Sequence, residues 1–449
     1  MKIKIYSQAI DYIESFIGKI IFKIKPRTSK NYDPLERMLV FLSFLGNPQN
    51  KFKSVLVGGT SGKGSTSYLI SRALIIAGYK TGFALSPHLQ KANERMQING
   101  KEISDKKFVK LLNQVLPAIE KMKKHKVGAP SYFEILVGMA FKYFEDQKID
   151  IAIVEVGMGG EFDATNILNP LISVLTNVSL DHIQSLGRTV EKIARTKAGI
   201  IKGGVVVSGV KQPSVIKIVK DRCSKTNAKL NLLWRDFGYK IKKESTSKTD
   251  YDFISDSEVF DDLQLSLLGH YQVENASLAL KTILELRKLR FKISDEAIRK
   301  ALKTAFFPGR FEIVKSDKNL LILDGAHNPV KIREFLKSLK KIFPKEKKTF
   351  VVGFKFDKDI KKMLKEIINV ADKIIVTQFN MKTDMMIYAS AKVEDINKQI
   401  KRTKYDGEII IEKDLRKALR VGFRRGGELT VVTGSLYLVG EARNKIALF

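Results

Sequence analysis

The segment KSVLVGGTSGKGST, residues 53–66, constrains the fold of this chain more than any other stretch. Its apolar run 54–57 is long enough for one buried strand, and residues 65–78 have helical character and end at a glycine. Between them, four glycines surround Lys63 within seven positions. Such a loop can turn its backbone N–H groups toward phosphate oxygens, and the lysine adds a charge for the β- and γ-phosphates. The segment therefore predicts a strand, a phosphate-binding loop and a helix.

The loop departs from the pattern G-x-x-x-x-G-K-[ST], whose final hydroxyl ligates magnesium. Gly64 occupies that position here, so the hydroxyl must come from another part of the chain. Ser86 directly follows an expected strand over 80–85, and ligands bind at the carboxyl ends of strands in open α/β sheets. Ser86 is therefore a candidate for the missing hydroxyl, with an ordinary turn before Pro87 as the alternative.

Residues 150–156 (DIAIVEV) read as a buried strand with an acid, Glu155, near its end. An unpaired carboxylate inside such a strand is costly unless it lies at the sheet edge and meets a cation. An acid at a strand end after a phosphate loop often anchors magnesium. Lys197 lies on a mostly apolar helical segment, 189–201, where it either extends to solvent or serves a metal or phosphate site. Four of the five histidines, His182 among them, follow strands or lie in glycine- or proline-punctuated segments.

The length of 449 residues favours two domains. The sequence FFPGRF, residues 306–311, interrupts the helical pattern, and alternating strands and helices resume after it. We therefore expect one domain over residues 1–306 and a smaller α/β domain with a largely parallel sheet over 307–449. The single cysteine suits a reducing, cytoplasmic location, and the charged N-terminal segment has neither a secretory core nor a membrane span.

The formal net charge of +32 admits two classes of partner, nucleic acids and small anionic substrates. The basic residues are scattered in short clusters, without a basic tail or a motif that reads bases. This pattern favours a lysine-rich surface with some attraction for anionic substrates. We expect no nucleic-acid partner and no membrane partner.

Motifs along nearly the whole chain resemble folylpolyglutamate synthase and bifunctional dihydrofolate synthase, which belong to the Mur-ligase superfamily. They occur in the family's order: PLERMLVFLSFLGNPQ (34–49), GGTSGKGS (58–65), SPHL with NERMQING (86–100), SYFE (131–134), VEVGMGGEFDATN (154–166), LDHIQSLG (180–187), TKAGIIK (196–202), GHYQVENA (269–276), PGRFE (308–312), DGAHNP (324–329), FDKDIKKML (356–364) and TGSLYLVGEAR (433–443).

The resemblance implies a central P-loop ATPase domain with a mostly parallel sheet and a smaller Rossmann-like C-terminal domain that serves glutamate ligation. It implies a ligase that uses ATP, two Mg²⁺ ions, L-glutamate and a folate or dihydropteroate, and we expect this ligase to be a monomer. The γ-phosphoryl group moves to a folate carboxylate, and the amine of glutamate attacks the resulting acyl phosphate.

Carried over by motif, the resemblance implies four sets of site residues. The nucleotide contacts are Gly59, Thr60, Ser61, Gly62, Lys63, Gly64, Ser65, Asn275, Arg310, Asp324 and His327. The metal ligands are Ser86, Glu155, His182 and Lys197, with N6-carboxylation of Lys197. The catalytic residues are Lys63, His182, Lys197 and Arg310. The acceptor pocket is formed by Ser131, Tyr132, Phe133, Phe162, Asp163 and Ala164.

The chain departs from the family pattern at three positions: Ser61 replaces asparagine, Glu161 replaces arginine, and Thr196 replaces glutamate. Glu161 places an anion beside the acceptor segment, so two alternatives stay open. One is a Mur-type ligase that adds an amino acid to a non-folate carboxylate. The other, of a different class, is a nucleotide-binding regulator or a nucleic-acid-associated ATPase.

Overall fold

The structure is a computed structural model that describes residues 2–18, 35–256, 258–316, 319–382, 387–423 and 429–446. The chain divides into two compact units. Unit 1 comprises residues 1–240, 251–263 and 274–305, and unit 2 comprises 241–250, 264–273 and 306–449. The two short segments 241–250 and 264–273 thus belong to unit 2, although they precede the boundary expected near residue 306. Within the described residues, no helix is both long and apolar enough to cross a membrane.

Unit 1 is built on an eight-stranded sheet with the strand order β4-β3-β2-β5-β1-β6-β7-β8. The strands from β2 to β8 in this order are parallel, and β3 and β4 add an antiparallel edge. The bounds are β1 (Lys53–Gly58), β2 (Thr81–Ala84), β3 (Met96–Ile98), β4 (Lys101–Glu102), β5 (Ile151–Glu155), β6 (Ile172–Leu175), β7 (Val205–Ser208) and β8 (Lys229–Leu232).

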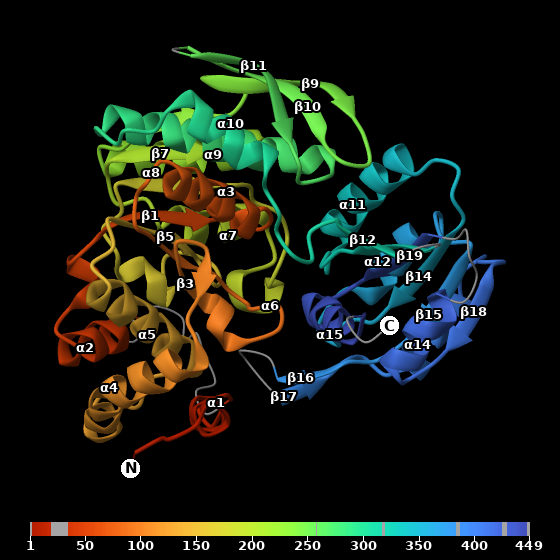
Figure 1. Ribbon diagram of the computed structural model, residues 1–449, viewed down its shortest axis with the longest axis horizontal. Helices are drawn as coiled ribbons and strands as arrows, with labels where there is room; N and C mark the ends of the chain where they lie inside the picture. The colour runs from red at the N-terminus through yellow and green to blue at the C-terminus, as the bar shows by residue number, and fades with distance from the viewer. Residues whose placement is uncertain are drawn as a thin grey trace. The chain divides into compact units, whose positions relative to one another are not determined.

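Helices surround this sheet, with α3 packed on β1 and β5, α10 packed on α3, and α1 packed on α4 (Figure 1). They are α1 (Tyr6–Glu14), α2 (Glu36–Phe44), α3 (Lys63–Ile76), α4 (Asp105–Lys124), α5 (Tyr132–Asp146), α6 (Ile183–Leu186), α7 (Val190–Ala198), α8 (Pro213–Lys225), α9 (His270–Lys288) and α10 (Asp295–Lys303), with short 3-10 turns at Pro48–Asn50, Ala92–Arg95 and Ala164–Ile167. A separate three-stranded sheet has the order β11-β10-β9, from β9 (Phe237–Glu244), β10 (Thr249–Ser255) and β11 (Val259–Leu265).

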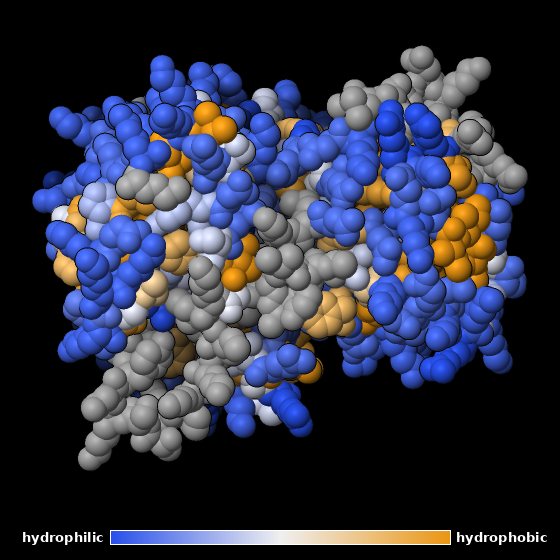
Figure 2. All heavy atoms as spheres, turned by 90° about the horizontal axis from the view of Figure 1, so that it is seen from below, coloured by the Kyte–Doolittle hydropathy of each residue, from blue (hydrophilic) through white to orange (hydrophobic). Residues whose placement is uncertain are grey.

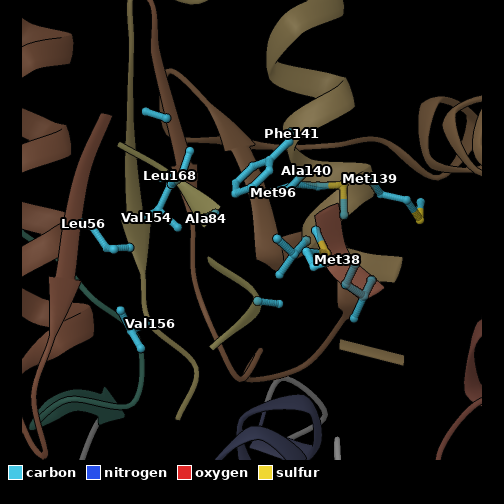
Figure 3. Close-up of a cluster of buried hydrophobic side chains, with 14 of the residues drawn as sticks. Met38, Leu56, Ala84, Met96, Met139, Ala140, Phe141, Val154, Val156 and Leu168 are labelled. Carbon is cyan, nitrogen blue, oxygen red and sulfur yellow. The ribbon is translucent and has the colours of Figure 1, made fainter. Parts of the chain in front are cut away.

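The core of unit 1 joins the central strands to α2 and α5. Leu56 of β1, Val154 of β5 and Ala84 of β2 lie in the same cluster as Met38 of α2 and Phe141 of α5 (Figure 3). Every residue of β5 is buried, which explains its continuous apolar sequence, because a central parallel strand is covered on both faces. This packing fixes the strand ends, where the polar residues of interest lie.

Unit 2 contains a six-stranded sheet with the order β12-β13-β19-β14-β15-β18, in which only β12 is antiparallel to its neighbour. Its elements are β12 (Glu312–Ser316), β13 (Asn319–Leu323), α11 (Pro329–Ile342), β14 (Lys348–Val352), α12 (Ile360–Ile367), β15 (Lys373–Val376), β16 (Asn380–Lys382), β17 (Ile387–Ala389), α13 (Val393–Lys401), β18 (Glu408–Ile411), α14 (Leu415–Phe423), β19 (Leu429–Thr433) and α15 (Leu436–Ile446). Both units therefore have the expected α/β class with mostly parallel sheets.

Candidate functional site

The glycine-rich loop joins β1 to α3, and two of its glycines allow close approach of other backbone and side-chain atoms. Gly59 has φ 138°, and a methyl group there would lie 1.9 Å from Thr176 Oγ1. Gly62 precedes α3 with φ 80°, and a methyl group there would lie 2.1 Å from Asn275 Oδ1. Both positions therefore require glycine. Lys63, Gly64 and Ser65 form the first turn of α3, whose free backbone N–H groups favour an anion.

Residues after β6 hold this loop in place. The backbone N–H groups of Thr60 and Ser61 donate to the backbone and side-chain oxygens of Asn177, both at 2.9 Å. Thr176 Oγ1 donates to the carbonyl of Ser61 at 2.6 Å, and the Ser179 N–H donates to Thr60 Oγ1 at 3.0 Å. The loop shape is therefore set by a neighbouring strand end as well as by its glycines.

Glu155 lies at the end of β5, between the loop lysine and the segment after β2. Its carboxylate is buried, with one oxygen 3.9 Å from Lys63 Nζ, and the other accepts the Ser86 N–H at 3.3 Å. Among the described residues, Ser86 Oγ is a buried atom without a hydrogen-bond partner. Because β2, β5 and β1 are adjacent and parallel, their carboxyl ends bring these three residues to one edge of the sheet.

Lys197 and His182, the two other expected metal ligands, differ in burial and in contacts. Lys197 is buried on α7, and its Nζ donates to the Gly59 carbonyl at 2.8 Å. His182 precedes α6 with a left-handed backbone (φ 48°), and its Nε2 lies 4.0 Å from Asp181 Oδ1. Lys197 thus contacts the phosphate-loop backbone directly, whereas the His182 side chain is 36% exposed.

The six expected acceptor residues fall in two segments that meet beside Gly157. Ser131 caps α5, Tyr132 is buried and Phe133 is half-buried; a methyl group at Gly157 would lie 2.6 Å from Phe133 Cζ. Asp163 is buried, and its two oxygens accept from Met158 N (2.8 Å) and from Thr165 N and Oγ1 (3.0 and 2.6 Å). Burial raises the pKa of Asp163, and its hydrogen bonds to Met158 and Thr165 hold the loop. Phe162 and Ala164 flank it, half-buried and buried.

The expected residues of unit 2 lie on two adjoining segments, with Arg310 just before β12 and Asp324 and His327 just after β13. Asp324 is buried and accepts the N–H groups of Phe311 and Ala326, both at 2.9 Å, and burial raises its pKa. The Arg310 guanidinium lies 5.4 Å from the Phe307 ring centre. His327 Nδ1 contacts the Gly325 carbonyl at 2.8 Å, and its Nε2 lies 3.0 Å from Lys331 Nζ. Asp324 therefore joins the segment that carries Arg310 to the segment that carries His327.

Comparison with known proteins gives matches in both parts of the chain. The Mur ligase middle domain matches residues 57–283, and the C-terminal domain of dihydrofolate synthetase matches residues 310–444. The dihydrofolate synthase/folylpolyglutamate synthase of Bacillus subtilis is 32% identical over 435 residues, covering 96% of this chain and 97% of the relative.

Solved structures agree with these matches. The folylpolyglutamate synthase of Thermotoga maritima is 32% identical, with a TM-score of 0.84 and coverage of 98% of this chain and 96% of that one. E. coli FolC in complex with DHPP and ADP is 25% identical, with a TM-score of 0.83 and coverage of 99% and 98%.

The chain belongs to the dihydrofolate synthase/folylpolyglutamate synthase family. The expected resemblance and the expected Mur-ligase fold are thereby confirmed.

Ser86 and Glu155, at the ends of β2 and β5, fit a magnesium ion that also binds nucleotide phosphates. Among the described residues, no three His, Cys, Asp or Glu side chains form a metal-binding group. Magnesium needs fewer, because it commonly takes one or two carboxylates together with substrate phosphates and water. The buried Ser86 Oγ and the Glu155 carboxylate supply two oxygen donors. Lys197 as an amine is a hydrogen-bond donor, so it fits a metal only when carboxylated.

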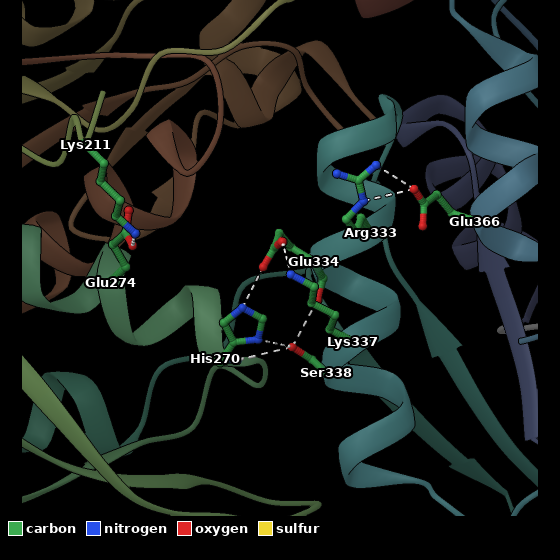
Figure 4. A network of polar contacts seen from close by, with 8 residues as sticks. All are labelled: Lys211, His270, Glu274, Arg333, Glu334, Lys337, Ser338 and Glu366. Carbon is green, nitrogen blue, oxygen red and sulfur yellow. Dashed lines mark hydrogen bonds and ion pairs between the residues drawn. The ribbon is translucent and has the colours of Figure 1, made fainter. Parts of the chain in front are cut away.

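Sequence reasoning overlooked several residues that shape the synthase-family site. Asn177 and Thr176 hold the phosphate loop. In the sequence, only their place at the end of an expected strand pointed to this role. Arg95 donates through Nε to His88 Nδ1 at 2.8 Å and lies 5.7 Å from the Tyr132 ring centre, so His88 has a structural contact. In unit 2, His270 contacts Glu334 and Ser338 of α11 (Figure 4), a pairing that sequence spacing does not reveal.

Proposed function

We propose that this protein joins L-glutamate to the carboxylate of a folate in a reaction driven by ATP. The substrate carboxylate takes the γ-phosphoryl group of ATP, the resulting acyl phosphate is attacked by the glutamate amine, and inorganic phosphate leaves. The supporting observation is the convergence of Lys63, Ser86 and Glu155 beside a glycine loop, in a chain that matches this family nearly end to end. Such transfers depend on positioning and charge neutralisation, which these groups supply.

Each residue near the loop has a distinct role in this proposal. The first turn of α3 and Lys63 hold the β- and γ-phosphates, and Asn275 lies against the loop at Gly62. Ser86 and Glu155 would hold one Mg²⁺, and His182 with a carboxylated Lys197 would hold a second. Magnesium bound there neutralises phosphate charge. Carboxylation would turn the Lys197 amine into a carbamate, which keeps one N–H that can donate to the Gly59 carbonyl and adds anionic oxygen donors for the metal.

The acceptor site lies along the first turn of α5 and the Gly157–Ala164 loop. Phe133 and Phe162 offer aromatic surface for a planar ring system, while Asp163 keeps the loop in shape. In unit 2, Arg310, Asp324 and His327 form the group proposed to contact the nucleotide or the incoming glutamate. Residues 1–306 and 307–449 remain our proposed functional domains, and a monomer is the proposed working form.

One observation favours a second candidate, a ligase with a non-folate acceptor. Glu161 adjoins the acceptor segment, where its N–H donates to the Thr196 carbonyl at 2.8 Å. A carboxylate there disfavours an acceptor whose own carboxylates come close to it, because like charges repel. An acceptor with fewer anionic groups near this point would suit it better.

The decisive experiment measures phosphate release from ATP and magnesium with L-glutamate and a panel of acceptors: dihydropteroate, tetrahydrofolate and its monoglutamylated forms. Release that requires both glutamate and one pteroyl acceptor is expected, and the stimulating acceptor identifies the step. If no pteroyl acceptor stimulates release, the folate acceptor is ruled out and the second candidate is favoured instead. Release that needs neither glutamate nor any acceptor contradicts both candidates.

A further inference from the structure

A buried ion pair lies behind the proposed acceptor segment. Arg37 of α2 contacts Glu134 of α5 through two bonds, Nε to Oε2 at 2.8 Å and Nη2 to Oε1 at 2.9 Å. The side chains are only 7% and 5% exposed. A pair this deeply buried loses hydration that its attraction only partly offsets, so it contributes little to stability relative to an apolar pair. The ion pair therefore matters for the placement of α2 and α5 more than for the free energy of unfolding.

The same carboxylate fixes the start of α5. Glu134 Oε2 accepts the Ser131 N–H at 2.7 Å, and Ser131 Oγ accepts the Glu134 N–H at 3.2 Å, which together form a capping box. Arg37 holds the carboxylate in the one orientation that makes this possible. The first turn of α5 is thus bound to α2 as well as capped, and this turn carries Tyr132 and Phe133.

That turn contacts both segments that carry the proposed first metal ligands. Phe133 packs against Gly157, two residues after Glu155. The Tyr132 ring lies below the Arg95 guanidinium, and Arg95 donates to His88, two residues after Ser86. One helical turn therefore sits against the loop after β5 and the loop after β2.

We propose that Arg37 and Glu134 are positioning residues for the acceptor. They act through the first turn of α5, whose placement sets the acceptor pocket and keeps it in register with the Ser86 and Glu155 loops. This inference rests on the proposed function. It predicts that loss of the pair weakens acceptor binding selectively, because the phosphate loop is held by Thr176 and Asn177 instead.

The test uses the double variant Arg37→Met/Glu134→Leu in the full-length protein. Replacing both partners with apolar side chains avoids leaving one charge buried alone, which would endanger folding. Acceptor dissociation constants are measured by calorimetry without ATP or magnesium, alongside KM for ATP and for the acceptor. We expect the dissociation constants of the acceptor to rise about 10-fold or more, since small misplacements of binding groups are costly. KM for ATP should change less than about twofold, because Thr176 and Asn177 still hold the phosphate loop. The single variant Arg37→Lys, which keeps a cation beside Glu134, should lose less acceptor affinity than the double variant.

A matched control removes another buried pair of unit 1, Lys281 and Glu285, which lie 3.0 Å apart on α9 and are 4% and 2% exposed. The variant Lys281→Met/Glu285→Leu should leave acceptor binding unchanged. Equal acceptor affinity in wild type and Arg37→Met/Glu134→Leu would overturn the inference, and so would parallel losses for ATP and acceptor. If the wild type binds no pteroyl acceptor, the proposed function fails first and this inference fails with it.

Discussion

At the scale of single residues, Glu155 is where separate parts of the site meet. One carboxylate oxygen faces Lys63 at 3.9 Å, and the other accepts the Ser86 N–H. The lysine is close enough for attraction but too far for a hydrogen bond, so each group keeps capacity to bind a phosphate oxygen or a cation. A buried acid in contact with a lysine and beside an unpartnered hydroxyl is suited to organise a cation site.

Replacing Lys63 or Glu155 with alanine tests this arrangement. Each change should lower acceptor-dependent phosphate release by about 10²-fold or more, because one charged group is lost from the phosphate site. Circular dichroism should show an intact fold. Lys51→Ala, at an exposed lysine two residues before β1, is the matched control and should keep wild-type activity. Wild-type turnover in either site variant would contradict the assignment.

Lys197 gives a second prediction at this scale. If it is carboxylated, native mass spectrometry should show the added mass of one carboxyl group, which disappears after acid treatment. Lys197→Ala should lose activity, and short carboxylates such as formate or acetate should restore part of it by supplying the missing oxygen donor. Full activity of Lys197→Ala without any added carboxylate would refute a role in catalysis.

At the scale of elements, α3 offers a comparison between its two ends. Gly62 before the helix and Gly78 after it both have positive φ, 80° and 92°. A methyl group at Gly62 would collide with Asn275, whereas nothing lies within 4 Å of one at Gly78. Alanine at Gly78 would therefore introduce backbone strain alone, whereas alanine at Gly62 would introduce backbone strain and a steric clash with Asn275.

Alanine at each glycine should therefore have different consequences. Gly78→Ala should cost about 1–2 kcal/mol of unfolding free energy from backbone strain alone and leave ATP affinity unchanged. Gly62→Ala should add a loss of ATP affinity of about 10-fold or more, because the loop must move away from Asn275. Nucleotide titrations and denaturant unfolding of both variants provide the measurement. Equal ATP affinities in the two variants would contradict the prediction.

The contact of α11 with His270 predicts that the free energy of unfolding depends on pH (Figure 4). The hydrogen bond from His270, at 2.7 Å, together with Lys337, lowers the pKa of Glu334 to about 2 despite partial burial. A carboxyl group with a lowered folded pKa stabilises the fold above its unfolded pKa, here 4.5, and loses this contribution as pH falls toward 2. Unfolding free energies of wild type and Glu334→Gln should therefore differ at pH 6 and converge between about pH 4.5 and 2.

The partners of Glu334 provide the control for that prediction. The His270 hydrogen bond is the largest cause of the lowered pKa, and Lys337 is 59% exposed. His270→Gln should therefore flatten the pH dependence more than Lys337→Gln does. The opposite order would show that the lysine, rather than the histidine, sets the pKa of Glu334.

The sequence predicted elements better than it predicted contacts. Strands such as β5 and helices such as α4 were evident because apolar periodicity and capping are local. The start of α9 at His270, five residues before Asn275, and the helices α8 and α15 were not predicted. The meeting of Ser86 with Glu155 followed from the rule on parallel strand ends. The Arg37–Glu134 pair, 97 residues apart in sequence, followed from no local signal.

At the scale of the whole molecule, charge is the dominant surface property. The formal net charge is +32, and Figure 2 shows hydrophilic side chains over most of the face seen from below, with hydrophobic ones in small groups. Many lysines pair locally with acids, such as Lys142 with Glu145 and Asp146. A high positive charge attracts small anions, including ATP and folates, as readily as it attracts nucleic acids.

This charge allows the nucleic-acid alternative to be tested directly. We expect any DNA or RNA binding to be weak, to disappear steeply as salt rises from 50 to about 200 mM, and to leave phosphate release unchanged. Acceptor-dependent release should persist at the higher salt. Filter binding and phosphate assays over the same salt series give the comparison. Phosphate release stimulated by nucleic acid and indifferent to glutamate would favour the alternative.

The strand order β2-β5-β1-β6 has a consequence for how the protein is made. All four strands, and the loops at their carboxyl ends, come from residues 53 to 179. The surroundings of Lys63, Ser86 and Glu155 can therefore assemble on the ribosome while residues 306–449 are still untranslated. A nascent chain stalled shortly after α7 would already contain Lys197 and its partner Gly59. Because Asn275 and residues 274–305 complete unit 1 around this loop, stabilisation by nucleotide is expected only after those residues have been made.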